Sequence, residues 1–277
     1  MIAKDIFGIV AIFLLLSFVT ATPLLAQDEQ KPAADDAAAI AKKLANPIGA
    51  LISLPFQNNM DIAIGDYSGS RNTLNIQPIV PFSLNAKYSL ITRYIVPVIA
   101  QYDITGEDTR QSGLADALVS GWISNAVVKN GFVWGVGAAF LVPTATDDFL
   151  GTQKFGVGPT VIVLQQKNGW TYGALMNQIW SVAGDADRSD VNQMYLQPFL
   201  TYNWKSGAGL TVNSETTLNW EANTTNAYIN IMAGGLTKFG KQLVQLQVGP
   251  RIQVAAPEGS KSPFGVRAAV IFVFPKK

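Results

Sequence analysis

The chain has no cysteine and no histidine among its 277 residues. Without cysteine there is no disulfide framework, no thiolate metal site and no lipid-anchored N-terminal cysteine. Without histidine the chain lacks the usual general base and the commonest metal ligand, so a Ser-His or Asp-His catalytic arrangement is impossible. Pairs of Glu and Asp could still act as acid and base, but no pair stands out. We therefore expect neither an enzyme nor a bound metal or cofactor.

Charge is also scarce. Charged residues make up 14% of the chain and hydrophobic residues 48%, whereas soluble domains typically carry about 25% charged residues. The net charge is +1, which gives no electrostatic reason to bind nucleic acid. Beyond the N-terminus there is no run of about 18 apolar residues, so any membrane-spanning part must be built from strands.

Residues 1–26 have the pattern of a secretory signal peptide. Lys4 is a short basic region, Phe7 to Val19 form an apolar core, and Ala26-Gln27 fits the cleavage site. The alternative is an uncleaved anchor helix, but the apolar core is short for a membrane span. We therefore expect export, followed by cleavage.

Residues 27–48 are rich in Ala, Asp and Lys. Ala33 to Ala45 predict a short helix that ends at Asn46-Pro47, because proline cannot continue a helix. Two interpretations remain open for this segment. It is either a mobile periplasmic tail or a segment that tucks into the mouth of the domain that follows.

One turn recurs three times in residues 49–277, at a spacing of 38 residues: Lys129-Asn130-Gly131, Lys167-Asn168-Gly169 and Lys205-Ser206-Gly207. Asn-Gly between apolar runs is the strongest short signal for a tight hairpin. The spacing leaves room for two strands of about eleven residues, the length that crosses a membrane at a tilt of about 45°. The repeat therefore predicts a closed antiparallel barrel.

Twelve strand-like segments can be counted, joined by five short turns that alternate with six longer connections, the first of them at residues 58–70. Short periplasmic turns and longer outer loops are typical of bacterial outer-membrane barrels, and an even strand number places both termini on the periplasmic side. The segments begin near Ala50, Asn72, Lys87, Leu114, Phe132, Phe155, Trp170, Asn192, Gly209, Asn226, Gln242 and Phe264.

Side chains alternate between apolar and polar in these segments, as in Gln242 to Val254. Alternation also suits the two sheets of a soluble sandwich, but the signal peptide, the long strands, the low charge and the aromatic residues favour a membrane barrel. Aromatic rings gather at membrane interfaces, so we expect two girdles. One lies beside the short turns and the other near the outer loops: Phe132, Trp170, Tyr202 and Trp204, and Trp180 and Trp220.

Charged residues within the strands are expected to face the lumen, because Arg on the lipid face costs about 2–4 kcal/mol at mid-depth. They would form either a structural ion-pair network or a constriction on a substrate path. The candidates are Arg93, Asp116, Glu215, Arg251 and Arg267.

Five prolines fall inside predicted strands. Each removes one ladder hydrogen bond, so we expect a bulge or a bend at each site: Pro78, Pro97, Pro159, Pro198 and Pro250.

Several short segments resemble the outer-membrane β-barrel family named for the MetA pathway of phenol degradation. They are Ala45 to Phe56, Asn75-Ile76-Gln77-Pro78, Ser112 to Asp116, and the Gln-Pro or Gly-Pro pairs at Pro159, Pro198 and Pro250. Members are described as outer-membrane transporters, some associated with the breakdown of aromatic compounds. The resemblance implies transport, fixes no substrate and carries no catalytic residues. Such barrels tend to end on an aromatic residue, whereas here Pro275-Lys276-Lys277 follow Phe272 and Phe274.

Together these observations predict an all-β chain: a transmembrane antiparallel up-and-down β-barrel of about 12 strands, with a short N-terminal periplasmic helix or tail. We expect it in the outer membrane of a Gram-negative bacterium, surrounded by lipid and lipopolysaccharide and inserted by the barrel-insertion machinery. Eight strands fill with side chains and sixteen leave an aqueous channel, so we expect a narrow or partly plugged pore. The predicted function is passive passage of small molecules, including hydrophobic or aromatic ones. The alternative is a non-conducting structural or surface-binding barrel.

Overall fold

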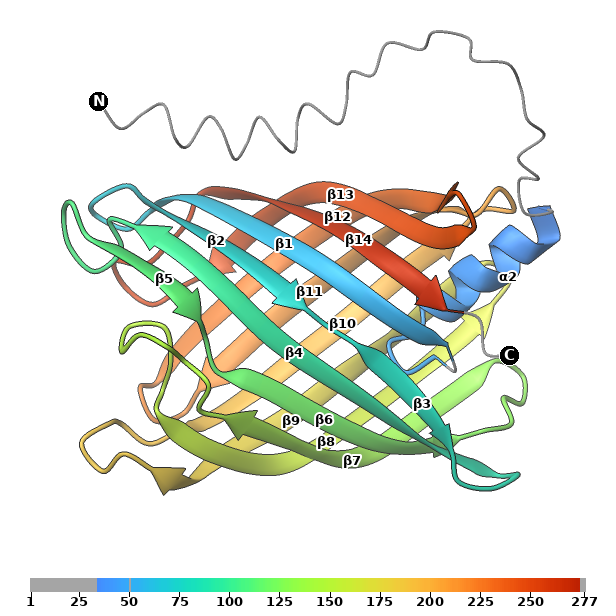
Figure 1. Cartoon of the computed structure of the whole chain (residues 1–277), viewed down its shortest axis with the longest axis horizontal. Helices are drawn as coiled ribbons and strands as arrows, with labels where there is room; N and C mark the ends of the chain where they lie inside the picture. Colours follow the sequence, from blue (N-terminus) through green and yellow to red (C-terminus); the bar gives the residue numbers. More distant parts are fainter. Residues whose placement is uncertain (1–33, 50, 275–277) are drawn as a thin grey trace, which may run out of the picture. The chain divides into compact units, whose positions relative to one another are not determined.

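The computed structural model describes residues 34–49 and 51–274, so the predicted signal peptide, residues 27–33 and the last three residues lie outside the described part. One helix and fourteen strand segments make up this part (Figure 1). They are α2 (Ala34–Leu44), β1 (Ile52–Ile64), β2 (Gly69–Ile76), β3 (Ile79–Ser83), β4 (Tyr88–Tyr102), β5 (Arg110–Leu114), β6 (Ala117–Asn125), β7 (Phe132–Val142), β8 (Lys154–Lys167), β9 (Trp170–Gly184), β10 (Asn192–Asn203), β11 (Ala208–Asn219), β12 (Thr224–Phe239), β13 (Gln242–Ala255) and β14 (Phe264–Phe274).

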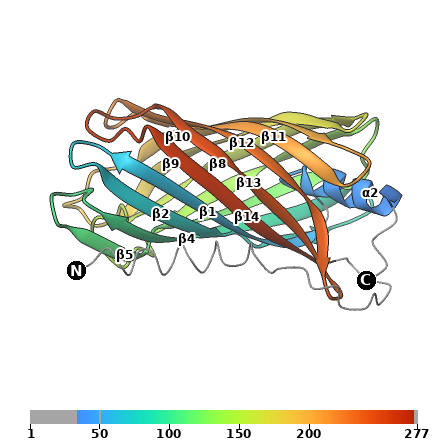
Figure 2. The same ribbon diagram turned by 90° about the horizontal axis from the view of Figure 1, so that it is seen from above.

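The strands form one closed antiparallel barrel, in which each strand pairs with its neighbours in sequence and β14 pairs with β1 (Figures 1 and 2). Two of its twelve strands are each interrupted once: β2 and β3 are separated at Gln77-Pro78, and β5 and β6 at Ala115-Asp116. Closure leaves the first and last strands without a free edge. The predicted fold class and strand count are confirmed.

The Asn-Gly turns have the geometry that their sequence demands. Asn130 and Gly131 have φ angles of 52° and 78°, and Asn168 and Gly169 have 51° and 83°. Positive φ at both central residues defines the I′ turn, whose twist matches that of the flanking strands. In the third copy Gly207 has a φ of 84°, whereas Ser206 does not share the positive angle, so this turn is of another type.

The segment before β1 packs into the end of the barrel that carries the short turns (Figure 1). Helix α2 contacts β10, β11 and β12, and its Ala37 and Ala41 are buried. The helix ends where Asn46 Oδ1 accepts a hydrogen bond of 3.0 Å from the backbone N–H of Ile48. Ile48 then inserts into an apolar cluster with Trp122. For the described part of this segment, residues 34–48, the structure agrees with the interpretation in which it tucks into the barrel.

The strand prolines behave in two different ways. Pro78 lies at the break between β2 and β3, and Pro97 faces the break between β5 and β6, where its carbonyl accepts the N–H of Ala115 at 2.9 Å. At Pro159, Pro198 and Pro250 the pairing register is the same before and after the proline. Of the expected bulge or bend, a bulge is therefore absent at these three prolines, because the flanking residue pairs keep their alignment.

The outer surface of the barrel is apolar, with exposed Val, Leu, Ile and aromatic side chains along its strands. Near the short turns the rings of Trp170, Tyr202 and Trp204 contact one another, with centroids 4.7 and 5.4 Å apart. At the opposite end Trp220 is exposed, and its indole N–H donates to Gln178 at 3.2 Å. These positions suit the two predicted girdles. Among the described residues no helix is long and apolar enough to cross a membrane.

Candidate functional site

One side of the lumen carries a continuous row of polar residues, held in line by the strand register. Each residue stands directly opposite the next on the neighbouring strand, so the row crosses β11, β12, β13, β14, β1, β2, β4 and β5. Its members in this order are Asn213, Asn230, Arg251, Gly265, Asp61, Arg71, Gln101 and Gln111. Side chains directly opposite in antiparallel strands lie close enough to interact. The sheet itself therefore assembles this polar surface, which we call the arginine wall and to which Glu215, Arg267 and Asn59 also belong.

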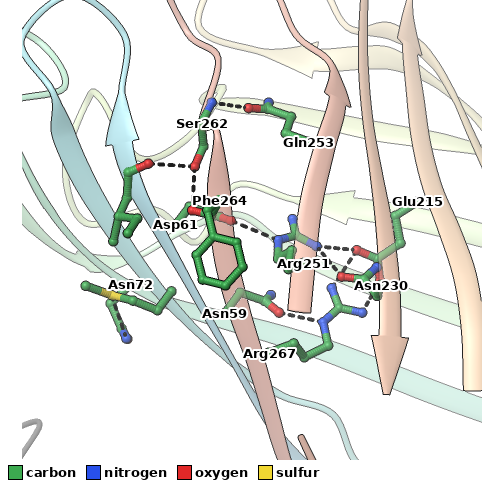
Figure 3. A network of polar contacts seen from close by, with 12 residues as sticks. Asn59, Asp61, Asn72, Glu215, Asn230, Arg251, Gln253, Ser262, Phe264 and Arg267 are labelled. Atoms are coloured by element: carbon green, nitrogen blue, oxygen red, sulfur yellow. Dashed lines mark hydrogen bonds and ion pairs between the residues drawn. The ribbon is translucent and has the colours of Figure 1, made fainter. Parts of the chain in front are cut away.

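Glu215 on β11 is the centre of the ion pairs in the arginine wall (Figure 3). Arg267 donates to both of its carboxylate oxygens, at 2.6 and 2.8 Å, and Arg251 donates to one at 2.9 Å. Two-point Arg–carboxylate contacts fix orientation as well as charge. Arg267 also donates to Asn59 Oδ1 at 2.7 Å, so this network ties β11 to β14 and β1.

Arg251 is held on several sides at once. Its Nε donates to Asp61 Oδ1 at 3.1 Å and its Nη1 to Asn230 Oδ1 at 3.2 Å (Figure 3). Its guanidinium also lies 3.4 Å from the ring centroid of Tyr228, within the range of a cation–π contact. These partners fix the position and orientation of the Arg251 guanidinium, so its positive charge stays at one place in the lumen.

Gly265 makes the Arg251–Asp61 contact possible. It stands between the two residues in register, opposite Asp61 on β1 and opposite Arg251 on β13. A Cβ at Gly265 would lie 2.6 Å from Asp61 Oδ1 and 2.7 Å from the carbonyl oxygen of Met60. The ion pair therefore spans β14 through the space that a side chain would occupy.

Another part of the lumen wall, which we call the apolar wall, is formed by large hydrophobic residues of β6, β7 and β9: Leu118, Trp122, Leu141, Leu175 and Ile179. Trp122 is 1% exposed, and its indole N–H donates to Thr160 Oγ1 at 3.1 Å. The partner matters because an indole N–H that is buried without one would be costly. The hydrogen bond fixes the tryptophan ring on the wall.

A cavity of about 370 Å³ lies between the two walls. Pockets that hold small molecules measure about 300–1,000 Å³ and are mostly apolar, with a few placed polar groups. The charged residues that line this cavity are four arginines and two carboxylates: Arg71, Arg93, Arg251 and Arg267, and Asp61 and Glu215. Its lining therefore carries two net positive charges.

Four of the five charged residues predicted to face the lumen line this cavity: Arg93, Glu215, Arg251 and Arg267. Asp116 does not line it, which corrects that expectation. Its carboxylate lies at the break between β5 and β6, where it accepts hydrogen bonds from Thr152 N and Oγ1, both at 2.6 Å, and from Ala145 N at 3.3 Å. Asp116 thus anchors the connection between β7 and β8.

The sequence did not single out several residues that line the cavity, among them Asp61 and Arg71 of the arginine wall and Tyr228. Asp61 falls within residues 58–70, the range expected to be a loop, and Arg71 lies between this range and the strand expected from Asn72. The structure instead extends β1 to Ile64 and begins β2 at Gly69. A signal was present, since Asn59, Asp61, Arg71 and Thr73 keep the alternation of lumen-facing residues across the turn.

The site's chemistry is that of fixed charges, amides and hydrophobic side chains. Among the residues that the structure describes, no group of three or more acidic side chains is placed to hold a metal ion. The arrangement can orient and select a small molecule through charge-assisted hydrogen bonds and hydrophobic contact.

No family model and no curated protein matches the sequence. By structure, the chain is similar to the COG4313 outer membrane channel from Pseudomonas putida F1, with a TM-score of 0.66, 14% identity, and coverage of 83% of this chain and 97% of the other. It is less similar to the outer membrane phospholipase A from Escherichia coli, with a TM-score of 0.47 and 9% identity over 82% of this chain and 99% of the other. The first likeness shows the fold, a closed barrel of the kind found in outer membrane proteins.

Proposed function

We propose that this protein is an outer-membrane channel for the passive passage of small molecules, hydrophobic or aromatic ones among them. The observation that carries the proposal is the cavity of about 370 Å³ between the apolar wall and the arginine wall. A barrel that served only as a scaffold would gain from closing such a space, because an unfilled lumen forfeits packing contacts.

The position of the ion pairs supports passage. Glu215, Arg251 and Arg267 come from β11, β13 and β14, which are close neighbours on one side of the barrel. Their contacts therefore run along that side and leave the cavity beside them open. Fixed charges beside an open path select what passes.

Two further observations support the proposal. The neighbour that shares the fold is described as an outer membrane channel, and the sequence resembles a family of outer-membrane transporters. The apolar outer surface suits outer-membrane lipid and lipopolysaccharide as its surroundings.

Uptake of N-phenyl-1-naphthylamine by Escherichia coli that expresses the protein tests the proposal. This neutral aromatic probe is held back by the intact outer membrane and fluoresces once it reaches membrane lipid. We expect faster uptake with the wild-type chain than with Ser120→Trp, because Ser120 is small and lines the cavity. Ser206→Trp, in an exposed turn, is the matched control and should behave like the wild type. Equal uptake with and without the protein, at equal amounts of folded barrel, would refute the proposal.

A non-conducting structural or surface-binding barrel is the second candidate. It is favoured by the segment before β1, which contacts β10 to β12 and inserts Ile48 among the buried residues of the lumen. Replacing Ile48 by Ala separates the two functions. Faster uptake in the variant indicates a gate on a path, whereas no uptake in either protein favours the non-conducting barrel.

A further inference from the structure

The structure assigns a substrate class to this lumen: we propose that the cavity binds amphipathic carboxylates, with the anionic group on Arg93 and the apolar body on the apolar wall. This inference rests on the proposed function, because the bound molecule is taken to be one that passes. The residues that line the cavity have a formal net charge of +2.

The arginines of the arginine wall are paired within the protein. Arg251 and Arg267 make ion pairs with Asp61 and Glu215. Arg71 stands directly opposite Asp61 in the register of β1 and β2, and its Nε donates to Gln101 at 2.8 Å. These three guanidinium groups therefore have internal partners.

Arg93 differs from them. Like Arg71, it donates to a neutral amide, through Nη2 to Gln77, and makes no ion pair with a carboxylate of the described residues. Unlike Arg71, it has no carboxylate opposite it in the strand register, where it faces Ile79 on β3 and Ser120 on β6. Its Nε is buried and lacks a hydrogen-bond partner within the described part of the chain. A buried donor without a partner is costly, and an anion in the cavity would supply both the missing charge and the missing acceptor.

Arg93 also stands where the two walls meet. On β4 it lies between β3, which continues the barrel strand of β2 from the arginine wall, and β6, which belongs to the apolar wall. Its register partner on β6 is Ser120, and the residues on either side of Ser120 on the same face are Leu118 and Trp122. A ligand whose carboxylate reaches Arg93 can therefore lay its apolar part directly on the apolar wall.

This geometry favours an amphipathic anion over the alternatives. A free inorganic anion would leave the apolar wall in contact with water, and a purely apolar molecule would leave the charge of Arg93 unmatched. A cation would meet a lining that is already positive. A small aromatic carboxylate satisfies both the guanidinium and the wall.

Binding to the purified full-length mature protein in detergent tests the inference, with phenylacetate and phenylacetamide as the probes. These molecules differ by the exchange of a carboxylate for a neutral amide. For the wild type we expect a dissociation constant about tenfold lower for phenylacetate, the lower end of what a hydrogen bond to a charged group contributes. Arg93→Gln should remove this preference and leave phenylacetamide binding unchanged.

Arg110→Gln is the matched control, because Arg110 is exposed at the start of β5 and should keep the preference. Arg93→Lys retains the charge, and we expect it to restore part of the preference if Arg93→Gln folds poorly. Equal binding of the two probes by the wild type, or a preference that survives in Arg93→Gln, would overturn the inference.

The uptake of the neutral probe described above separates this inference from the proposed function. If that uptake is observed but phenylacetate is not preferred, the proposed channel is supported and the carboxylate site is refuted. If phenylacetate is preferred and Arg93→Gln removes the preference, but no uptake occurs, the carboxylate site is supported and the proposed channel is refuted.

Discussion

The arginine wall and the apolar wall face the same cavity, but they are held in place by different forces. The apolar wall packs as a hydrophobic core does, with Trp122 almost fully buried. In the arginine wall the charged groups lose hydration when they are buried, and this cost offsets most of the attraction within their ion pairs. The intact pairs therefore contribute little net stability. Removing one partner is nevertheless costly, because it leaves a buried charge unpaired. We therefore expect the apolar wall to contribute most to stability, whereas in the proposed channel the arginine wall selects what the lumen accepts.

The lipid environment sharpens this contrast. In the proposed outer-membrane location, apolar side chains on the outer surface face hydrocarbon, so they gain little from contact with one another. The lumen is therefore where packing and hydrogen bonds decide stability, and substitutions there test the comparison.

Trp122→Ala should have the largest effect. Removing a buried tryptophan costs about 4 kcal/mol, and the hydroxyl of Thr160 loses its indole donor. We expect the free energy of unfolding, measured in urea with the protein in lipid vesicles, to fall by about this amount. Trp220→Ala, at an exposed site, is the control. Equal losses in the two variants would mean that the apolar wall does not act as a core.

Glu215→Gln should have the next largest effect. The neutral side chain leaves Arg251 with one carboxylate and Arg267 with none, and breaking a buried ion pair costs about 3 kcal/mol. The same unfolding measurement should show this loss, and Glu221→Gln in an exposed turn should show almost none. An unchanged unfolding midpoint for Glu215→Gln would refute the idea that this carboxylate holds the arginine wall together.

Gly265→Ala tests the space through which Arg251 reaches Asp61. Its added methyl would crowd Asp61 Oδ1, and overpacking of this kind costs about 2 kcal/mol. Gly121→Ala is the matched control, because a Cβ there would lie 3.8 Å from Leu90 Cδ1, an ordinary van der Waals contact. If Gly265→Ala is as stable as its control, the absence of a side chain at this position is incidental.

The smallest effect is expected at an ion pair outside the lumen. Lys154 Nζ lies 3.1 Å from Asp190 Oδ1 near the outer connections. The hydrogen bonds from Lys154 and Ser181, together with the charge of Lys154, lower the pKa of the Asp190 carboxyl. A lowered pKa in the folded state stabilises the protein above the pKa of the unfolded chain, and this contribution is lost as the pH falls through the folded value.

Asp190→Asn should therefore remove a small pH dependence of the unfolding midpoint in the acidic range and change little at pH 7, because the carboxylate is exposed to solvent. A loss at neutral pH as large as that of Glu215→Gln would mean that ion pairs inside and outside the lumen are equivalent. The contrast between the lumen and the surface would then fail.

The strands and turns could be predicted from sequence because local chemistry determines them. Asn-Gly requires positive φ at both residues, and Asn130 and Gly131 have it. The loop predicted at residues 58–70 was wrong at both ends, because Asn59 and Asp61 are polar, as loop residues usually are, but belong to β1. In a barrel such residues also line the lumen, so polarity alone cannot distinguish a loop from a lumen-facing strand.

The candidate site could be predicted only in part. Charged residues in the middle of strands with strong alternation, such as Glu215 and Arg251, are expected to face inward, because a charge on the lipid face is destabilising. Their partners depend on register between strands far apart in the chain, as in the contact between Arg251 and Asp61. Asp116 was misassigned because the break at Ala115-Asp116 turns it toward Thr152, and no local signal marks that break.

Single-channel recording in a planar bilayer tests the central claim most directly, using the refolded mature protein beside Arg251→Ala and Glu215→Gln. We expect discrete conductance steps whose preference for anions falls in Arg251→Ala and rises in Glu215→Gln, because each substitution removes one lumen charge of known sign. A folded and inserted barrel that is silent, or one whose ion selectivity is unchanged in both variants, would contradict the claim that the arginine wall lines an open path.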